Sequence, residues 1–141
     1  MITLIDYGVG NIFAFQNVYK RLDIQTKIAK TTQDLEDAEK LILPGVGAFD
    51  YAMNQLNKSG MRQKLDELVL DKKIPVIGIC VGMQMMGNRS DEGSMEGLKW
   101  IDADIVKFDE NLIKHRTKLP HMGWNDVKPI KDHPLFKGLE D

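Results

Sequence analysis

The chain has 141 residues, a formal net charge of −2, and acidic and basic side chains that are interspersed along its length. This length suits one compact domain with a substantial core, so the sequence predicts a single domain over residues 1–141. No basic stripe is available for a nucleic-acid backbone and no acidic tail is present, which excludes a nucleic-acid partner and favours small molecules or proteins.

The chain contains one cysteine, Cys80, and therefore forms no internal disulfide. Its first residues, MITLID, lack the charged start and long apolar stretch of a signal peptide, and no apolar run reaches membrane-spanning length. These features predict a cytoplasmic protein that has no membrane partner and keeps its thiol reduced.

Short apolar runs alternate with amphipathic stretches along the chain, a pattern typical of a parallel sheet built from strand-helix-strand units. Strands are predicted over residues 2–5, 25–29, 40–43 and 74–79. Helices are predicted over residues 11–22, after a cap at Thr32, over 49–58, up to Asp71, and over 83–86. Residues 100–108 and 127–130 suggest two further strands, antiparallel to the rest. The sequence therefore indicates the α/β class.

The stretch GICVG, residues 78–82, places Cys80 between two glycines at the end of the most apolar predicted strand. A nucleophile elbow requires small residues two positions before and after the nucleophile, where larger side chains would collide. A helix beginning after Cys80 would also direct the positive end of its dipole at the sulfur and stabilise the thiolate. From this motif alone, a nucleophile and a small core residue are about equally well supported.

The stretch PGVG, residues 44–47, ends another predicted parallel strand and precedes a helix. Its glycines allow the backbone to present N–H groups to a bound carbonyl. This loop is a candidate for one arm of an oxyanion hole, with the amide after Cys80 as the other arm. An ordinary strand-to-helix turn would have the same composition.

Taken together, four motifs resemble one enzyme family: DYGVGN (6–11), PGVGAF (44–49), GICVGMQ (78–84) and PHMGWN (120–125). They are similar to motifs of the class I (triad) glutamine amidotransferases, and within that family to the glutaminase subunits of imidazole glycerol phosphate synthases. The four motifs occur in order over nearly the whole chain.

The resemblance implies a flavodoxin-like, mostly parallel sheet with helices on both faces. It implies an enzyme that hydrolyses L-glutamine and passes the ammonia to a cyclase subunit of (β/α)8-barrel type, with which it forms a heterodimer. That partner makes imidazole glycerol phosphate for histidine biosynthesis. The resemblance implies no cofactor and no metal.

The resemblance also assigns roles to individual residues. Cys80 would attack the side-chain amide of glutamine and form a γ-glutamyl thioester. The Val81 N–H and an amide of the Val46–Gly47 peptide region would hold the oxyanion. Gln84 and Glu92 would bind the substrate, Glu92 through the α-ammonium group, and their residue types suit these contacts. Without the resemblance, the simpler interpretation is a Gln on a helix surface and a solvated Glu in a loop.

Three further residues are expected at the interface with the cyclase. The resemblance places Asn11, Trp124 and Asn125 there, because the motifs at 8–11 and 120–125 lie on the family's partner-facing side. Core packing is the simpler explanation of Trp124 from the residues alone, although an exposed Trp beside a glycine also suits an interface.

One motif of the family is missing from these 141 residues. The family activates its thiol with a His-x-Glu pair near the C-terminus, whereas none of His115, His121 and His133 has an acidic residue two positions later. We therefore expect a chain truncated at its C-terminus, in which the C-terminal part of the fold is missing.

Three alternatives remain open from the sequence. Similar glutaminase subunits supply ammonia for amidino groups on surface sugars, and the stretches MMGN (85–88) and GLKW (97–100) leave this acceptor open. The chain could instead be a non-catalytic remnant that binds the cyclase. A cysteine hydrolase acting on another amide is the third, against which Gln84 and Glu92 argue.

Without a His-x-Glu pair, the chain as written is predicted to be a poor or inactive glutaminase even when folded, because a positioned acid-base contributes roughly 10²–10⁴ in rate. Single-turnover kinetics with labelled glutamine tests this expectation. A thioester burst followed by ammonia release at a normal glutaminase rate would refute it.

Overall fold

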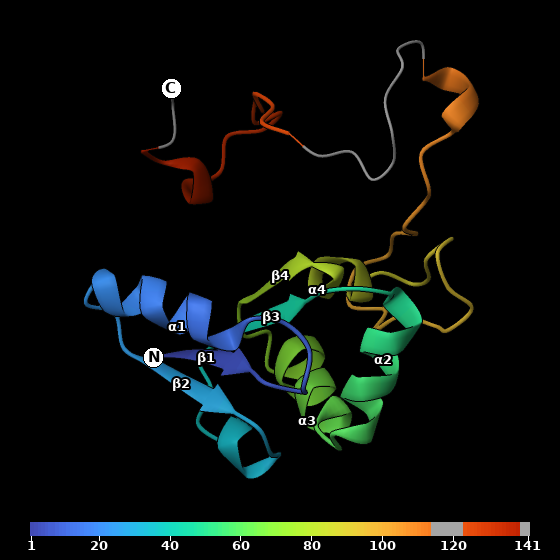
Figure 1. Cartoon of the computed structure of the whole chain (residues 1–141). Coiled ribbons are helices and arrows are strands. Elements are labelled where there is room, and N and C mark those ends of the chain that lie inside the picture. Colours follow the sequence, from blue (N-terminus) through green and yellow to red (C-terminus); the bar gives the residue numbers. More distant parts are fainter. Residues whose placement is uncertain (114–122, 139–141) are drawn as a thin grey trace. The chain divides into compact units, whose positions relative to one another are not determined.

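The computed structural model describes residues 1–113 and 123–138, which form two compact units (Figure 1). The first unit runs from Met1 to Phe108 and the second from Asp109 to Asp141. Among the described residues, no helix has the length and apolar character needed to cross a membrane.

The first unit is built on a four-stranded sheet in which every pairing is parallel. The strands lie in the order β2-β1-β3-β4, which is the beginning of a flavodoxin-like order. Their bounds are β1 (Ile2–Ile5), β2 (Thr26–Ala29), β3 (Lys40–Gly45) and β4 (Val76–Cys80). The four strands predicted from the apolar runs are thus confirmed.

Strand β3 continues two residues beyond its predicted end, through Pro44 to Gly45. Strand β1 pairs with β3 only as far as Ile42, so Pro44 has β4 as its single neighbour. Proline is tolerated at such edge-like positions because it has no N–H to donate to a second strand.

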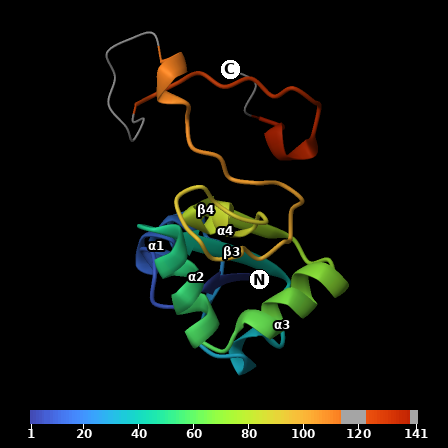
Figure 2. The same ribbon diagram turned by 90° about the vertical axis from the view of Figure 1, so that its right-hand side faces the viewer.

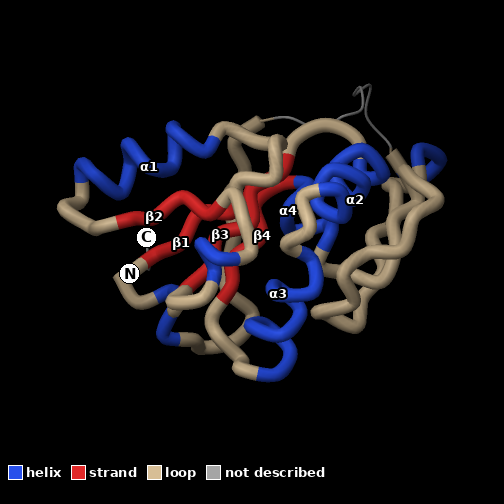
Figure 3. The backbone as a smooth tube through the Cα atoms, turned by 90° about the horizontal axis from the view of Figure 1, so that it is seen from below, coloured by secondary structure: helices blue, strands red, loops and turns tan. Residues whose placement is uncertain are grey.

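Helices cover both faces of the sheet, as predicted (Figure 3). Helix α1 (Ile12–Arg21) lies on one face, where Ile12 packs with Leu4 and Ile42. The other face carries most of the core. Its elements are α2 (Phe49–Lys58), α3 (Arg62–Asp66) with a π-turn at Glu67–Asp71, and α4 (Val81–Met85).

Side chains alternate between these two faces along β3, as expected for a strand with period two. Leu41 and Leu43 join the larger cluster beneath α2 and α4, whereas Ile42 joins the cluster beneath α1. Helices α2 and α3 lie on the same side of the sheet in the rotated view (Figure 2). Strand β3 is therefore packed on both faces.

Two helix predictions were wrong in detail. The helical spacing of Ile12, Phe15, Val18, Tyr19 and Leu22 predicts that all five lie on one buried face, but Val18 and Leu22 are 52% and 62% exposed. The capped helix expected after Thr32 is a single 3₁₀ turn (Gln33–Leu35), and the Thr32 side chain makes no capping hydrogen bond. The Asp34 carboxylate instead accepts the N–H groups of residues 30 and 31.

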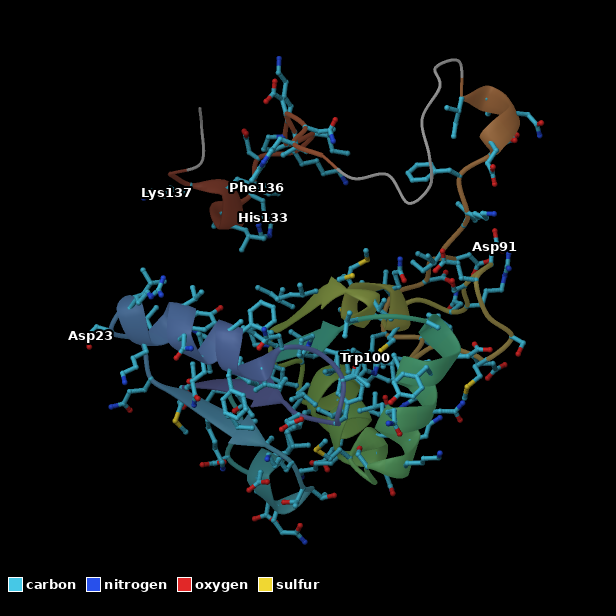
Figure 4. The ribbon with its side chains drawn as sticks, in the orientation of Figure 1. Asp23, Asp91, Trp100, His133, Phe136 and Lys137 are labelled. Carbon is cyan, nitrogen blue, oxygen red and sulfur yellow. The ribbon has the colours of Figure 1, made fainter. Side chains whose placement is uncertain are left out.

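Residues 100–108 were predicted to be a strand and are irregular instead. Their backbone is bonded locally: Ile105 N–H donates to Arg89 O (2.9 Å), and Ala103 O accepts Asn88 N–H (2.8 Å). Trp100, labelled in Figure 4, is the first residue of this stretch. Its indole N–H donates to Asp66 Oδ1 at 2.7 Å. These contacts tie the stretch to the loop after α4 and to the end of α3 rather than to a sheet edge.

The second unit contains two 3₁₀ turns among its described residues, Glu110–Leu112 and Pro134–Phe136. The strand predicted over residues 127–130 is not formed. Val127 and Ile130 are 87% and 95% exposed, so this stretch has no apolar surface against which to form a half-buried strand.

Helix α4 packs directly on the backbone of β3 and β4, and three glycines make this possible. A Cβ at Gly82 would overlap the carbonyl oxygen of Leu43, and a Cβ at Gly45 would overlap the backbone of Gly82. A Cβ at Gly78 would collide with Met83. The glycine spacing in GICVG is thus required by the close approach of a helix to its sheet.

We predict that Gly82→Ala lowers the free energy of unfolding by about 1–3 kcal/mol, because the added methyl must push α4 away from β3. Urea denaturation measures this loss. The control is Met83→Ala on the same helix: this side chain is 48% exposed, and the expected change is about 0.5 kcal/mol or less. Equal losses in the two variants would contradict the packing argument.

A buried tyrosine joins the ends of β1 and β3. Tyr7, 5% exposed, donates its hydroxyl to the carbonyl oxygen of Pro44 at 2.7 Å. Burial raises the pKa of Tyr7 well above its usual value, so the hydroxyl keeps its proton and remains a donor. The hydroxyl oxygen of Tyr7 also lies 3.5 Å from the Met85 sulfur in α4. The hydrogen bond from Tyr7 therefore holds the first residue of the PGVG loop in place.

Tyr7→Phe should lower the free energy of unfolding by about 1–3 kcal/mol, because it leaves the buried Pro44 carbonyl without its donor. Tyr51→Phe is the matched control, since Tyr51 is 54% exposed and its hydroxyl accepts a hydrogen bond from the Gln55 side chain on the same helix. Urea denaturation of both variants decides: equal stability of Tyr7→Phe and wild type would refute the role of this hydrogen bond.

Candidate active site

Cys80 lies at the sharp turn between β4 and α4, where the sequence motif placed a nucleophile. Its backbone has φ 56° and ψ −124°, a conformation that side chains other than glycine rarely adopt and that costs on the order of 1–3 kcal/mol. The cysteine is exposed. A strained, accessible residue between a strand and a helix is the geometry of a nucleophile elbow.

The PGVG loop lies beside this turn because β3 and β4 are paired to their ends. Gly45 is the direct partner of Cys80 in the parallel register. Val46 and Gly47 follow immediately and are exposed, and Gly47 has φ +84°, which permits a backbone turn that other residues resist. The structure thus brings Val46, Gly47 and Cys80 to the same edge of the sheet.

Val81 is the first residue of α4, and its side chain is buried at 5% exposure. The first N–H groups of a helix have no intrahelical acceptor. Val81 therefore lies at the same edge of the sheet as Cys80 and the PGVG loop, and its role in holding an oxyanion remains a prediction.

Gln84 lies on α4, one turn after Cys80, and is partly buried. Its Oε1 is fully enclosed, and within the described part of the chain it has no hydrogen-bond partner. Buried amide oxygens are normally satisfied, so this atom marks a site that suits a hydrogen-bond donor.

Glu92 is exposed and lies on the loop after α4, next to Asp91, which Figure 4 labels. Its backbone N–H donates to the hydroxyl of Ser90 at 3.2 Å, and Ser90 itself is 2% exposed. The polar residues 87–94 predict a loop here, and the backbone of Glu92 in this loop is anchored on a buried serine.

Two residues at this site were not identified from the sequence. Tyr7 donates its hydroxyl to the Pro44 carbonyl. Asp50, the second residue of α2, accepts hydrogen bonds from the backbone of residues 94 and 95. An aspartate in the first turn of a helix is explained by the helix dipole alone, so nothing in the local sequence indicated a distant partner. For Tyr7, its position shortly after a strand was the only feature of the sequence that could have indicated a buried hydroxyl.

The residues expected at a partner interface are exposed. Asn11 caps α1, where its side-chain oxygen accepts the N–H of Ala14 at 3.1 Å. Trp124 and Asn125 belong to the second unit, and Trp124 is fully exposed. The interface assignment itself remains a prediction for all three. The histidines at 115 and 121 lie outside the described residues.

Among residues 1–113 and 123–138, no group of three or more His, Cys, Asp or Glu side chains is arranged to hold a metal ion. The candidate site comprises a thiol at a strained turn, the backbone of the PGVG loop beside it, an enclosed amide oxygen on α4 and a carboxylate on the loop after α4. Chemically, this set suits nucleophilic attack on a carbonyl and stabilisation of the resulting oxyanion.

Comparison with known proteins agrees with this geometry. Residues 7–131 match the CobB/CobQ-like glutamine amidotransferase domain. A solved structure described as a glutamine amidotransferase superposes with a TM-score of 0.64 over 82% of this chain and 59% of its own, at 18% identity, which shows a common fold.

Two curated relatives are much more similar in sequence. The imidazole glycerol phosphate synthase subunit HisH of Bdellovibrio bacteriovorus is 55% identical over 99% of this chain and 69% of its own length. Subunit HisH 2 of Pseudomonas aeruginosa is 50% identical over 100% of this chain and 68% of its own length. The chain therefore belongs to the glutamine amidotransferase family, among the HisH subunits of imidazole glycerol phosphate synthase.

Proposed function

We propose that this chain is the glutaminase subunit of an imidazole glycerol phosphate synthase, hydrolysing L-glutamine and supplying ammonia to a cyclase partner in histidine biosynthesis. The observation that carries the proposal is the strained turn at Cys80, paired in register with Gly45 of the PGVG loop. An ordinary core cysteine would have no need of either feature.

In the proposed reaction, the Cys80 sulfur attacks the side-chain amide carbon of glutamine. The carbonyl oxygen becomes an oxyanion, which accepts hydrogen bonds from the Val81 N–H and from an amide of the Val46–Gly47 region. Collapse of this intermediate breaks the C–N bond, and the proton released by the Cys80 thiol is carried through water to the nitrogen, which leaves as ammonia. Water then hydrolyses the γ-glutamyl thioester to glutamate and restores the thiol.

Recognition of glutamine is assigned to Gln84 and Glu92. Gln84 lies on α4 one turn after Cys80 and is only partly buried, so its side-chain amide is proposed to exchange hydrogen bonds with the substrate. Glu92 offers a carboxylate for the α-ammonium group, a charge-assisted contact stronger than a neutral hydrogen bond.

The proposed partner is a cyclase of (β/α)8-barrel type, joined as a heterodimer through contacts to which Asn11 of the first unit and Trp124 and Asn125 of the second unit each contribute. An exposed tryptophan supports this assignment because Trp is enriched among residues that dominate binding energy at interfaces. The proposal keeps the protein in the cytoplasm, as the sequence predicts. Ammonia then passes to the cyclase without release to solvent.

A chloroketone analogue of L-glutamine tests the assignment of Cys80. The thiolate displaces chloride, forming an S–C bond as the C–Cl bond breaks, so labelling needs no acid to protonate a leaving amine. We expect one label per chain by intact mass spectrometry, located on Cys80, slowed by L-glutamine and reduced to background in Cys80→Ser.

The matched control is Met83→Ala, which alters an exposed side chain three residues away and should label like wild type. Iodoacetamide, which carries no glutamine-like group, reports the general reactivity of the thiol. Labelling that L-glutamine does not slow, or that persists in Cys80→Ser, would refute the proposed site.

A further inference from the structure

The Asp50 carboxylate holds the loop that follows α4, at residues far away in the sequence. Both of its oxygens accept the Ser94 N–H, at 3.1 and 2.9 Å. Oδ2 also accepts the Ser94 hydroxyl at 3.1 Å, and Oδ1 accepts the Met95 N–H at 3.0 Å. A Cβ at Gly93 would overlap Oδ1, so the loop fits closely around this carboxylate.

This contact links the two parts of the proposed glutamine site. Asp50 lies three residues after Gly47, in the first turn of the helix that the PGVG loop leads into. Ser94 lies two residues after Glu92, whose own N–H is held by the buried Ser90. Glu92 is therefore anchored on one side by Ser90 and on the other by Asp50.

Asp50 is suited to holding the loop and not to binding a ligand itself. The backbone hydrogen bonds from Ser94 and Met95 lower the pKa of its carboxyl, so it is charged at neutral pH. Each oxygen already accepts at least two of these bonds. Any effect on substrate must then pass through the loop.

We propose that Asp50 is a positioning residue that fixes the Glu92 carboxylate where it receives the α-ammonium group of glutamine. This inference rests on the proposed function and adds a specificity device to it. Asp50 makes the site prefer amides that carry an α-ammonium group. It does so by tying the Glu92 loop to the helix that begins beside the oxyanion loop.

A pair of chloroketones tests the proposal: the L-glutamine analogue, and the same compound without its α-amino group. The measured quantity is the ratio of their second-order rate constants for labelling Cys80. Asp50→Asn keeps the size of the side chain but turns an NH₂ group toward the loop N–H donors. We expect this ratio to fall roughly tenfold or more in Asp50→Asn and in Glu92→Gln, in line with the loss of one contact to a charged group.

The double variant shows whether Asp50 acts through Glu92. If it does, Asp50→Asn lowers the ratio no further in the Glu92→Gln background. Asp34→Asn is the matched control, because Asp34 also accepts two loop N–H groups and a hydroxyl, but at the end of β2. It should leave the ratio unchanged. Thermal unfolding and iodoacetamide labelling of each variant check that the fold and the thiol are intact.

Three results would overturn the inference: Asp50→Asn slows both reagents equally, its effect adds to that of Glu92→Gln, or Glu92→Gln itself leaves the ratio unchanged. None of these results would touch the assignment of Cys80, which depends on labelling that L-glutamine slows. A failure of that assignment would be seen in the wild-type protein. The two failures are therefore distinguishable.

Discussion

The close approach of α4 to the ends of β3 and β4 is the constraint on which the site depends. Side chains normally separate a helix from its sheet, but here Gly45, Gly78 and Gly82 let backbone meet backbone. This contact requires the chain to turn sharply at Cys80, which takes up a positive φ. The same contact brings the amide of Val81 beside the PGVG loop. The strain at the cysteine and the convergence of amides thus have one cause.

The parts of the fold that follow from local patterns were predictable. Apolar runs identified all four strands, and the spacing of small residues around Cys80 indicated a sharp turn there, although it supported a nucleophile and a core residue equally. These features are local because each depends on a few adjacent side chains and the period of its element. Residues 100–108 contain enough apolar side chains for a strand, yet the Trp100 indole bonds to Asp66 at the end of α3, and the Ile105 backbone bonds to the loop after α4. The absence of a strand depends on partners that are distant along the chain, such as Asp66, which is 34 residues from Trp100. No short window of sequence reveals such partners.

The missed residues at the site have the same explanation. Tyr7 and Pro44 are 37 residues apart, and Asp50 and Ser94 are 44 residues apart. Each pair is joined by the strand order, and the hydrogen bonds exist only once the strands are assembled. Asn11 shows the converse: the family resemblance gave it a role at an interface, while the structure gives it a helix cap as well. A substitution there would alter the helix as well as any contact with a partner.

The register of β3 against β4 has a consequence for how the molecule acquires its chemistry. Strand β3 is paired with β1 and β4, and residues 41–45 face residues 76–80, so the sheet consists of contacts between distant segments that form late in folding. The sharp turn at Cys80 is held by the packing of α4 on β3 and β4, so it cannot form before these strands pair. The reactivity proposed for the single thiol would therefore arise with the assembled sheet, and it would disappear when α4 detaches locally, even in a chain that is otherwise native.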